Sequence, residues 1–133
     1  MDIENNTLRE EELQQVAGGA DVLTAGESYD AAAVLQRAIA EIGKPYGFGA
    51  VGPEAYDCSG LVSYAVSGTH VRLFTTSSLL ACPRVSDPVP GDICVSGSHC
   101  GIYVGGGQMV HAPSFGTLVN YGPVQGGMIF VRP

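Results

Sequence analysis

The chain has 133 residues, of which 45% are hydrophobic and 14% charged. This length and composition fit a single packed domain and argue against a disordered chain. No apolar run approaches the ~20 residues that a membrane-spanning helix requires. The formal net charge of -7, with only 6 Lys and Arg residues, excludes the usual nucleic-acid binder, which gathers positive charge to contact phosphates.

The first 19 residues differ in kind from the rest. Thr7 and Glu10 form a capping-box pattern that predicts a short helix, and Gly18-Gly19 would end it. One interpretation is therefore a frayed terminal helix. The other is that this segment resembles a double-glycine leader, which peptidase-containing ABC exporters recognise and remove in bacteria. The positions that match are Leu8, Glu12, Leu13, Val16, Gly18 and Gly19.

The leader interpretation implies a secreted protein that begins at Ala20 once residues 1–19 are removed. Residues 1–20 have neither the basic start nor the apolar centre of an ordinary secretory signal. Residues 20–28 are small and polar and are interpreted as a linker, so the predicted folded domain covers residues 29–133.

Two helices are predicted next. The first starts at Ser28 or Asp30 and ends at Gly43-Lys44-Pro45, with apolar residues at helical spacing: Ala32, Leu35, Ile39 and Ile42. A glycine-rich loop follows over residues 46–57. The second helix runs from about Cys58 to Val66, and Gly68 stops it. Residues 69–91 show no firm pattern.

After Pro90-Gly91-Asp92, short β-favouring runs alternate with turns rich in Gly, Ser and Pro. The predicted strands are Asp92–Val95, His99–Val104, Gln108–Ala112, Leu118–Tyr121 and Met128–Val131. Helices followed by an antiparallel sheet indicate an α+β fold.

Cys58 is a candidate nucleophile because it stands at the start of a predicted helix. The positive end of the helix dipole and the free backbone N–H groups of the first turn both favour the thiolate. The same N–H groups can bind an oxyanion that develops on a substrate carbonyl. A cysteine nucleophile also needs a base, usually histidine, and a group that orients the base.

His99 and His111 are candidates for those two tasks. A turn at Gly105-Gly106-Gly107 would pair their strands and bring both imidazoles near the same end of the sheet. The spacing permits this arrangement without proving it. His70 has no neighbours that suggest a role.

Four segments in order resemble the NlpC-type family of bacterial cell-wall endopeptidases, over about residues 30–131. The segments are Asp57–Val62, Pro90–Asp92, His99–Gly105 and Gln108–Pro113. The resemblance implies a papain-like fold, with N-terminal helices packed on a five- or six-stranded antiparallel sheet. It also implies a triad in which Cys58 is the nucleophile, His99 the base and His111 the group that orients His99.

The resemblance further implies that Tyr46, Asp57 and Ser59 hold the substrate or line its pocket. Asp57 could bind an ammonium, while Tyr46 and Ser59 could donate to a carboxylate or carbonyl. The simpler alternative is that Asp57 and Ser59 only cap the helix and that Tyr46 packs on the core. The chain departs from the family pattern at Phe48-Gly49-Ala50, in the stretch before Pro90 and at Cys100, which bears on substrate preference.

The other cysteines leave alternatives open. A three-residue turn at Ser96–Ser98 would place Cys94 directly opposite Cys100, where a disulfide could form. Buried free thiols, Cys82 included, are at least as consistent with the sequence. The spacing of the four cysteines does not fit a structural zinc site, and the expected reaction needs no cofactor or metal.

The implied function is hydrolysis of peptidoglycan stem peptides, at the bond from the γ-carboxyl of D-Glu to diaminopimelate or lysine. The expected partners are the stem peptide, the exporter and, for an antibacterial protein, an immunity protein; no nucleic acid or membrane span is expected. Two alternatives remain. One is an amidase or acyl transferase on the same fold, and the other is a non-enzymatic modified precursor or binding domain.

Overall fold

The computed structural model describes residues 3–4, 6–7 and 29–133. Strands β1 (Ile3–Glu4) and β2 (Asn6–Thr7) pair with each other in parallel. Thr7 thus belongs to β2, and the rest of the predicted leader helix and the linker at 20–28 lie outside the described residues. Within the described ranges, no helix is long and apolar enough to cross a membrane.

Two ten-residue helices form close to their predicted positions. Helix α1 spans Ala31–Ala40, and the side chain of Asp30 caps it by accepting the N–H of Ala33. Helix α2 spans Cys58–Ser67 and ends at Gly68, whose φ of 75° is the left-handed conformation that glycine adopts without strain.

The buried face of α1 differs from the predicted one. Val34 and Ala38 are buried, whereas Ile39 is 40% exposed. The two buried residues face α2, which packs along α1. The apolar spacing therefore identified the helix correctly but misplaced the centre of its packed face by about one residue.

A third helix was not predicted. Helix α3 (Thr76–Leu80) has only five residues, too few for a periodic pattern to emerge. It is held by a capping box in which Thr75 and Ser78 each accept from the backbone N–H of the other. Leu79 anchors it in the core.

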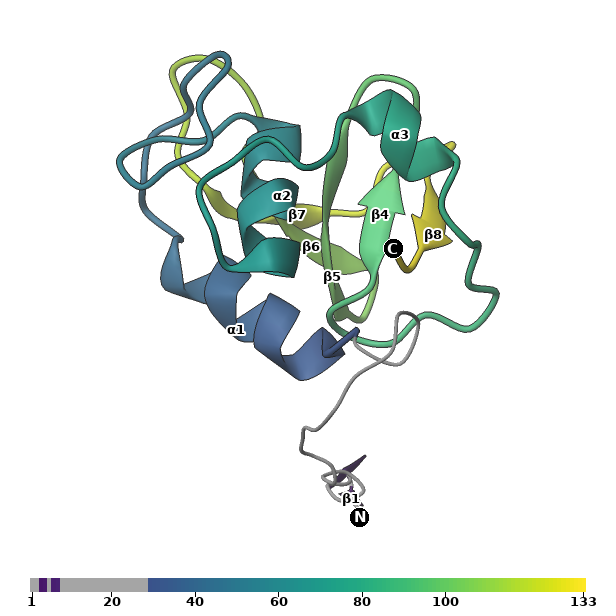
Figure 1. The fold of residues 1–133 in the computed structure, drawn as a ribbon. Helices are drawn as coiled ribbons and strands as arrows, with labels where there is room; N and C mark the ends of the chain where they lie inside the picture. The colour runs from purple at the N-terminus through teal and green to yellow at the C-terminus, as the bar shows by residue number, and fades with distance from the viewer. Residues whose placement is uncertain (1–2, 5, 8–28) are drawn as a thin grey trace.

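Five antiparallel strands form the sheet, in the order β7-β6-β5-β4-β8. Figure 1 shows α1 and α2 on one side of it, and α2 packs directly on β5. The strands are β4 (Ile93–Val95), β5 (Cys100–Gly105), β6 (Gln108–His111), β7 (Asn120–Pro123) and β8 (Ile129–Val131). This confirms the α+β class and a five-stranded sheet.

Strand β7 begins two residues later than predicted. The amide of Val119 donates to Lys44 O, and Val119 O accepts from the amide of Gly43. Leu118 pairs with Pro45. This part of the chain therefore pairs with the segment that follows α1, and it joins the sheet only from Asn120 onward.

The predicted pairing of Cys94 with Cys100 is wrong by one residue. Four residues connect β4 to β5, so Cys94 lies opposite Gly101 and Cys100 lies opposite Val95. A one-residue shift reverses the face to which a side chain points. Cys94 and Cys100 consequently point to opposite faces of the sheet, with Cys100 in the core cluster, and all four cysteines are free thiols.

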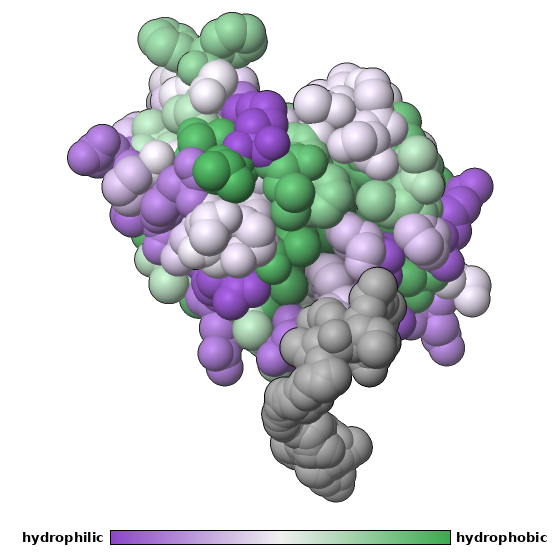
Figure 2. Space-filling model, in the orientation of Figure 1, coloured by the Kyte–Doolittle hydropathy of each residue, from purple (hydrophilic) through white to green (hydrophobic). Residues whose placement is uncertain are grey.

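Two loops adjoin at one end of the molecule, at the upper left of Figure 1: residues 46–57 and residues 112–119. The amide of Tyr46 donates to Thr117 O at 3.0 Å, which ties the two loops together. Apolar groups project above this region in Figure 2. Phe48 in the first loop is 93% exposed and Phe115 in the second is 88% exposed.

A buried ion pair fastens the end of the chain to the turn before β4. Asp92 is fully buried, and its two carboxylate oxygens accept from Arg132 at 2.7 and 2.9 Å. Oδ2 also accepts the N–H of Val89 at 2.8 Å. The side chain of Arg132 is 42% exposed, so water can reach its guanidinium. The buried carboxylate of Asp92 has only its protein partners to compensate its charge.

We therefore expect unequal costs when each partner is replaced. Arg132→Met leaves a buried carboxylate without its cation and should lower the free energy of unfolding by about 3 kcal/mol. Asp92→Asn keeps an oxygen for Val89 and leaves a guanidinium that water can reach, so it should cost less. Urea denaturation of both variants tests this, and equal or reversed losses would contradict it.

Candidate active site

Cys58 is the first residue of α2, and the loop before the helix is fixed against it. Asp57 Oδ1 accepts the N–H of Gly60 at 2.7 Å, and Oδ2 accepts the N–H of Gly49 at 3.0 Å. A Cβ on Gly60 would lie 2.1 Å from Ala50 O, so only glycine allows this loop to approach the helix. Cys58 is thereby held, half-buried, at the positive end of α2.

The surroundings of Cys58 lower the pKa of its thiol to about 5. The main cause is a hydrogen bond from the Cys100 thiol. A hydrogen bond from His99 and the positive charge of that ring also lower the pKa, while burial and the Asp57 carboxylate oppose them. At neutral pH the sulfur is therefore a thiolate, the nucleophilic form of cysteine.

His99 lies directly before β5, and His111 is the last residue of β6. The two rings meet with His99 Nε2 2.7 Å from His111 Nδ1, and both residues are buried. The structure therefore brings the two predicted imidazoles together. Since Nε2 of His99 is used by His111, Nδ1 is the nitrogen left for Cys58.

Burial, followed by the charge of His99, lowers the pKa of His111 to about 4. His111 is thus neutral at the pH at which Cys58 is a thiolate. We assign its proton to Nε2, so that Nδ1 accepts the N–H at Nε2 of His99.

Gly122 on β7 makes room for His111. A Cβ at this position would lie 2.3 Å from His111 Nε2 and 3.1 Å from Cδ2. Any larger residue would displace the ring from its contact with His99.

The three predicted substrate-binding residues all lie near Cys58. Tyr46 pairs with Tyr56, the residue before Asp57, and burial, followed by the charges of Asp57 and Cys58, raises the pKa of its phenol. Asp57 caps α2, as the simpler alternative expected. Asp57 and Ser59 both contact Arg72, which donates to Ser59 Oγ at 2.6 Å and to Asp57 Oδ1 and Oδ2 at 3.0 and 2.9 Å.

Sequence reasoning missed Arg72 and the role of Cys100. Arg72 lies in the stretch that shows no pattern, and its one signal was its charge in a chain with few cations. Cys100 was noted as unusual and as a possible disulfide partner of Cys94, but nothing in the sequence showed that it would act on the thiol of Cys58. His70, which had no expected role, stacks on Tyr64 with ring centroids 4.5 Å apart.

Comparison with known proteins identifies the family. Residues 43–131 match the model of the NlpC/P60 family. The chain therefore belongs to the NlpC/P60 family.

Its relatives are named as endopeptidases. A probable endopeptidase of Mycobacterium tuberculosis is 38% identical over 106 residues, which make up 74% of this chain and 28% of the relative. A probable endopeptidase of Corynebacterium glutamicum is 40% identical over 95 residues, or 66% of this chain and 46% of the relative. The chain thus spans less than half the length of these two relatives.

Solved structures agree on the fold. The NlpC/p60 domain of the peptidoglycan hydrolase SagA is 34% identical, with a TM-score of 0.63, over 78% of this chain and 98% of that domain. The peptidoglycan hydrolase RipB of Mycobacterium tuberculosis is 28% identical, with a TM-score of 0.64, over 77% of this chain and 63% of that chain. These likenesses confirm the papain-like α+β architecture.

The thiol chemistry gives a direct test. At pH 6.5, iodoacetamide should alkylate Cys58 and spare the other cysteines. Burial raises the pKa of Cys82, and that of Cys94 to about 12, while the hydrogen bond to Cys58 and burial raise that of Cys100. The alkylation rate, followed by mass spectrometry, should fall to half near pH 5 because the thiolate is lost as pH decreases through its pKa.

Cys58→Ala is the control and should remain unlabelled at pH 6.5. Cys100→Ala should shift the midpoint upward, since it removes the main hydrogen bond to the thiolate. A wild-type midpoint near the ordinary cysteine pKa of ~8.5 would contradict the arrangement.

Proposed function

We propose that this chain is a cysteine endopeptidase that hydrolyses peptidoglycan stem peptides, with Cys58 as the nucleophile, His99 as the base and His111 as the residue that orients His99. The observation that carries the proposal is the buried pair of imidazoles, 2.7 Å apart, beside a thiol whose pKa is lowered to about 5. The names of its relatives support the substrate class.

The proposed reaction has two steps. In the first, Sγ of Cys58 bonds to the peptide carbonyl carbon, the C–N bond breaks, and His99 gives its proton to the leaving amine. In the second, neutral His99 takes a proton from water, the hydroxide attacks the thioester, and the C–S bond breaks. This releases a carboxylic acid and restores the thiolate and the imidazolium.

The start of α2 offers donors for the oxyanion of each step. The amide of Gly60 is taken by the side chain of Asp57, and the amide of Leu61 by its carbonyl. The amides of Cys58 and Ser59 are therefore the first-turn groups available to a developing oxyanion. Both lie next to the attacking sulfur.

We assign the cleaved bond to the link between the γ-carboxyl of D-Glu and the third residue of the stem, diaminopimelate or lysine. We further propose that Tyr46, Asp57 and Ser59 line the pocket for the D-Glu side of this bond. Tyr46 lies close to Asp57 and Cys58, and Asp57 and Ser59 flank the nucleophile.

Purified muropeptides provide the test. Incubation with the full chain should yield fragments that end in D-Glu and fragments that begin with the third stem residue, each hydrolysis adding one water. Mass spectrometry identifies both products. The Cys58→Ala variant should yield neither; identical products from this variant, or none from the wild type, would refute the proposed activity.

We also propose that residues 1–19 are a leader, residues 20–28 a linker and residues 29–133 the catalytic domain, and that a peptidase-containing ABC exporter secretes the protein. The proposal rests on the spacing of Leu8, Leu13, Val16 and the double glycine. A secreted wall hydrolase could attack competing bacteria, in which case the producer needs an immunity protein.

The leader makes its own prediction. The protein secreted by the producing bacterium should begin at Ala20, as measured by mass spectrometry of the intact chain. Gly19→Leu should block cleavage, because a bulky side chain at the second glycine would not fit a narrow peptidase channel. A secreted protein that retains residues 1–19 would rule the leader out.

A further inference from the structure

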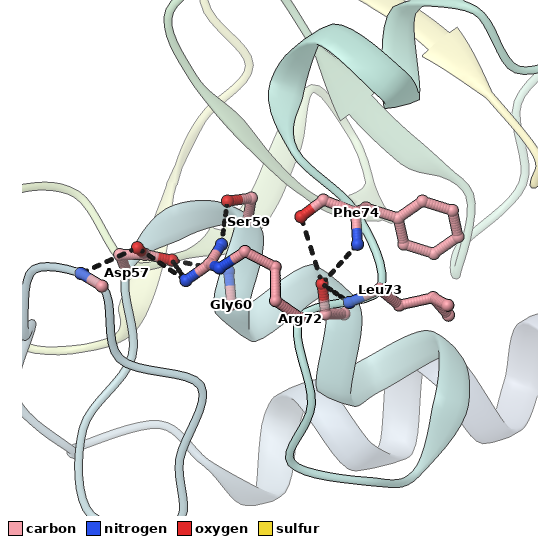
Figure 3. A network of polar contacts seen from close by, with 8 residues as sticks. Asp57, Ser59, Gly60, Arg72, Leu73 and Phe74 are labelled. Carbon is pink, nitrogen blue, oxygen red and sulfur yellow. Dashed lines mark hydrogen bonds and ion pairs between the residues drawn. The ribbon is translucent and has the colours of Figure 1, made fainter.

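Arg72 occupies the polar site that adjoins the nucleophile. Figure 3 shows its guanidinium between Asp57 and Ser59, the two residues on either side of Cys58 in the sequence. It donates to both carboxylate oxygens of Asp57 and to the hydroxyl of Ser59. These three acceptors would otherwise suit a substrate ammonium, as the sequence suggested for Asp57.

The position of Arg72 is built into the fold. The segment that carries it is tied to α2 by Ser63, which is fully buried. Ser63 Oγ accepts the N–H of Leu73 at 3.1 Å and that of Phe74 at 2.9 Å (Figure 3). The guanidinium is therefore held over Asp57 by the backbone of the next two residues, and its side chain is only 33% exposed.

This arrangement has an electrostatic consequence. The carboxylate of Asp57 is 15% exposed and is neutralised by the ion pair. A substrate ammonium would have to displace a guanidinium that makes three hydrogen bonds, and it would meet the positive charge of that group while doing so. A neutral acylated nitrogen carries no such charge and meets no such repulsion.

We propose that Arg72 is a specificity-determining residue that fills the cation site beside Cys58, so that the enzyme selects stem peptides whose amino end is acylated and discriminates against those with a free ammonium. The proposal rests on the proposed function. The amino group of L-Ala lies two residues ahead of the bond to be cut, which is about 7 Å for α-linked residues and longer here by the two extra bonds of the γ link. In the intact wall this nitrogen is joined to the glycan by an amide, whereas in a released peptide it is charged.

Two substrates that differ only in this group provide the test: L-Ala-γ-D-Glu-diaminopimelate with a free amino end, and the same peptide N-acetylated. For the wild type, kcat/KM should be higher for the acetylated peptide. Arg72→Met, which keeps the length of the side chain and removes its charge, should shift the ratio of the two kcat/KM values toward the free peptide by about tenfold.

The ratio of the two kcat/KM values, and not either value alone, tests the inference. Loss of Arg72 uncovers the charge of Asp57, which raises the pKa of Cys58 and should slow the cleavage of both peptides alike. Arg72→Lys should retain the wild-type preference, since it keeps the positive charge. Arg84→Met is the matched control: Arg84 is an exposed arginine that pairs through its backbone with Val131, and its loss should leave the ratio unchanged. If Arg72→Met does not fold, Arg72→Gln carries the same expectation.

A wild-type preference for the free peptide, or a ratio that Arg72→Met leaves unchanged, would overturn the inference while leaving the proposed function intact. Should the wild type cleave neither peptide, the proposed function fails. The inference is then decided by calorimetric binding of the two peptides to Cys58→Ala with and without Arg72→Met. The same shift in preference would support it, and equal affinities would refute it.

Discussion

The site depends on one interaction, the contact between the two buried imidazoles. Burial keeps His111 neutral, and a neutral ring can accept a hydrogen bond from His99 where a charged one would repel it. This acceptor fixes the ring of His99 through its Nε2 and leaves Nδ1 for Cys58. A carboxylate in the place of His111 would put a negative charge into this buried site, whereas the neutral imidazole brings none.

The fold positions the thiol and the two imidazoles by separate means. Local interactions hold the thiol: the Asp57 cap, the close approach of Ala50 to Gly60 and the left-handed Gly68 at the far end of α2. The imidazoles depend instead on the pairing of strands distant in sequence from that helix. Because α2 packs on β5, the helix and the sheet meet where Cys100 contributes its hydrogen bond to the sulfur of Cys58.

Much of this could be predicted because it is encoded over short distances. The helix start at Cys58 and its glycine end follow from local conformational preferences, and the strands are runs of β-favouring residues between turns rich in Gly, Ser and Pro. What failed depends on long-range pairing. The start of β7 is set by the contact of Val119 with Lys44, and the partner of Cys94 by the four-residue connection between β4 and β5. Arg72 could not be found because the segment that carries it is held by individual side-chain contacts, such as those of Ser63, and not by any repeating pattern.

Gly122 shows how far such a site extends beyond its reactive groups. The strand that carries it is at the edge of the sheet, where substitutions are usually tolerated, and the residue itself can neither bind nor react. Yet the absence of its side chain leaves the space that the ring of His111 fills. An inventory of candidate functional residues compiled by chemical reactivity would omit Gly122, although the position of His111 depends on its missing side chain.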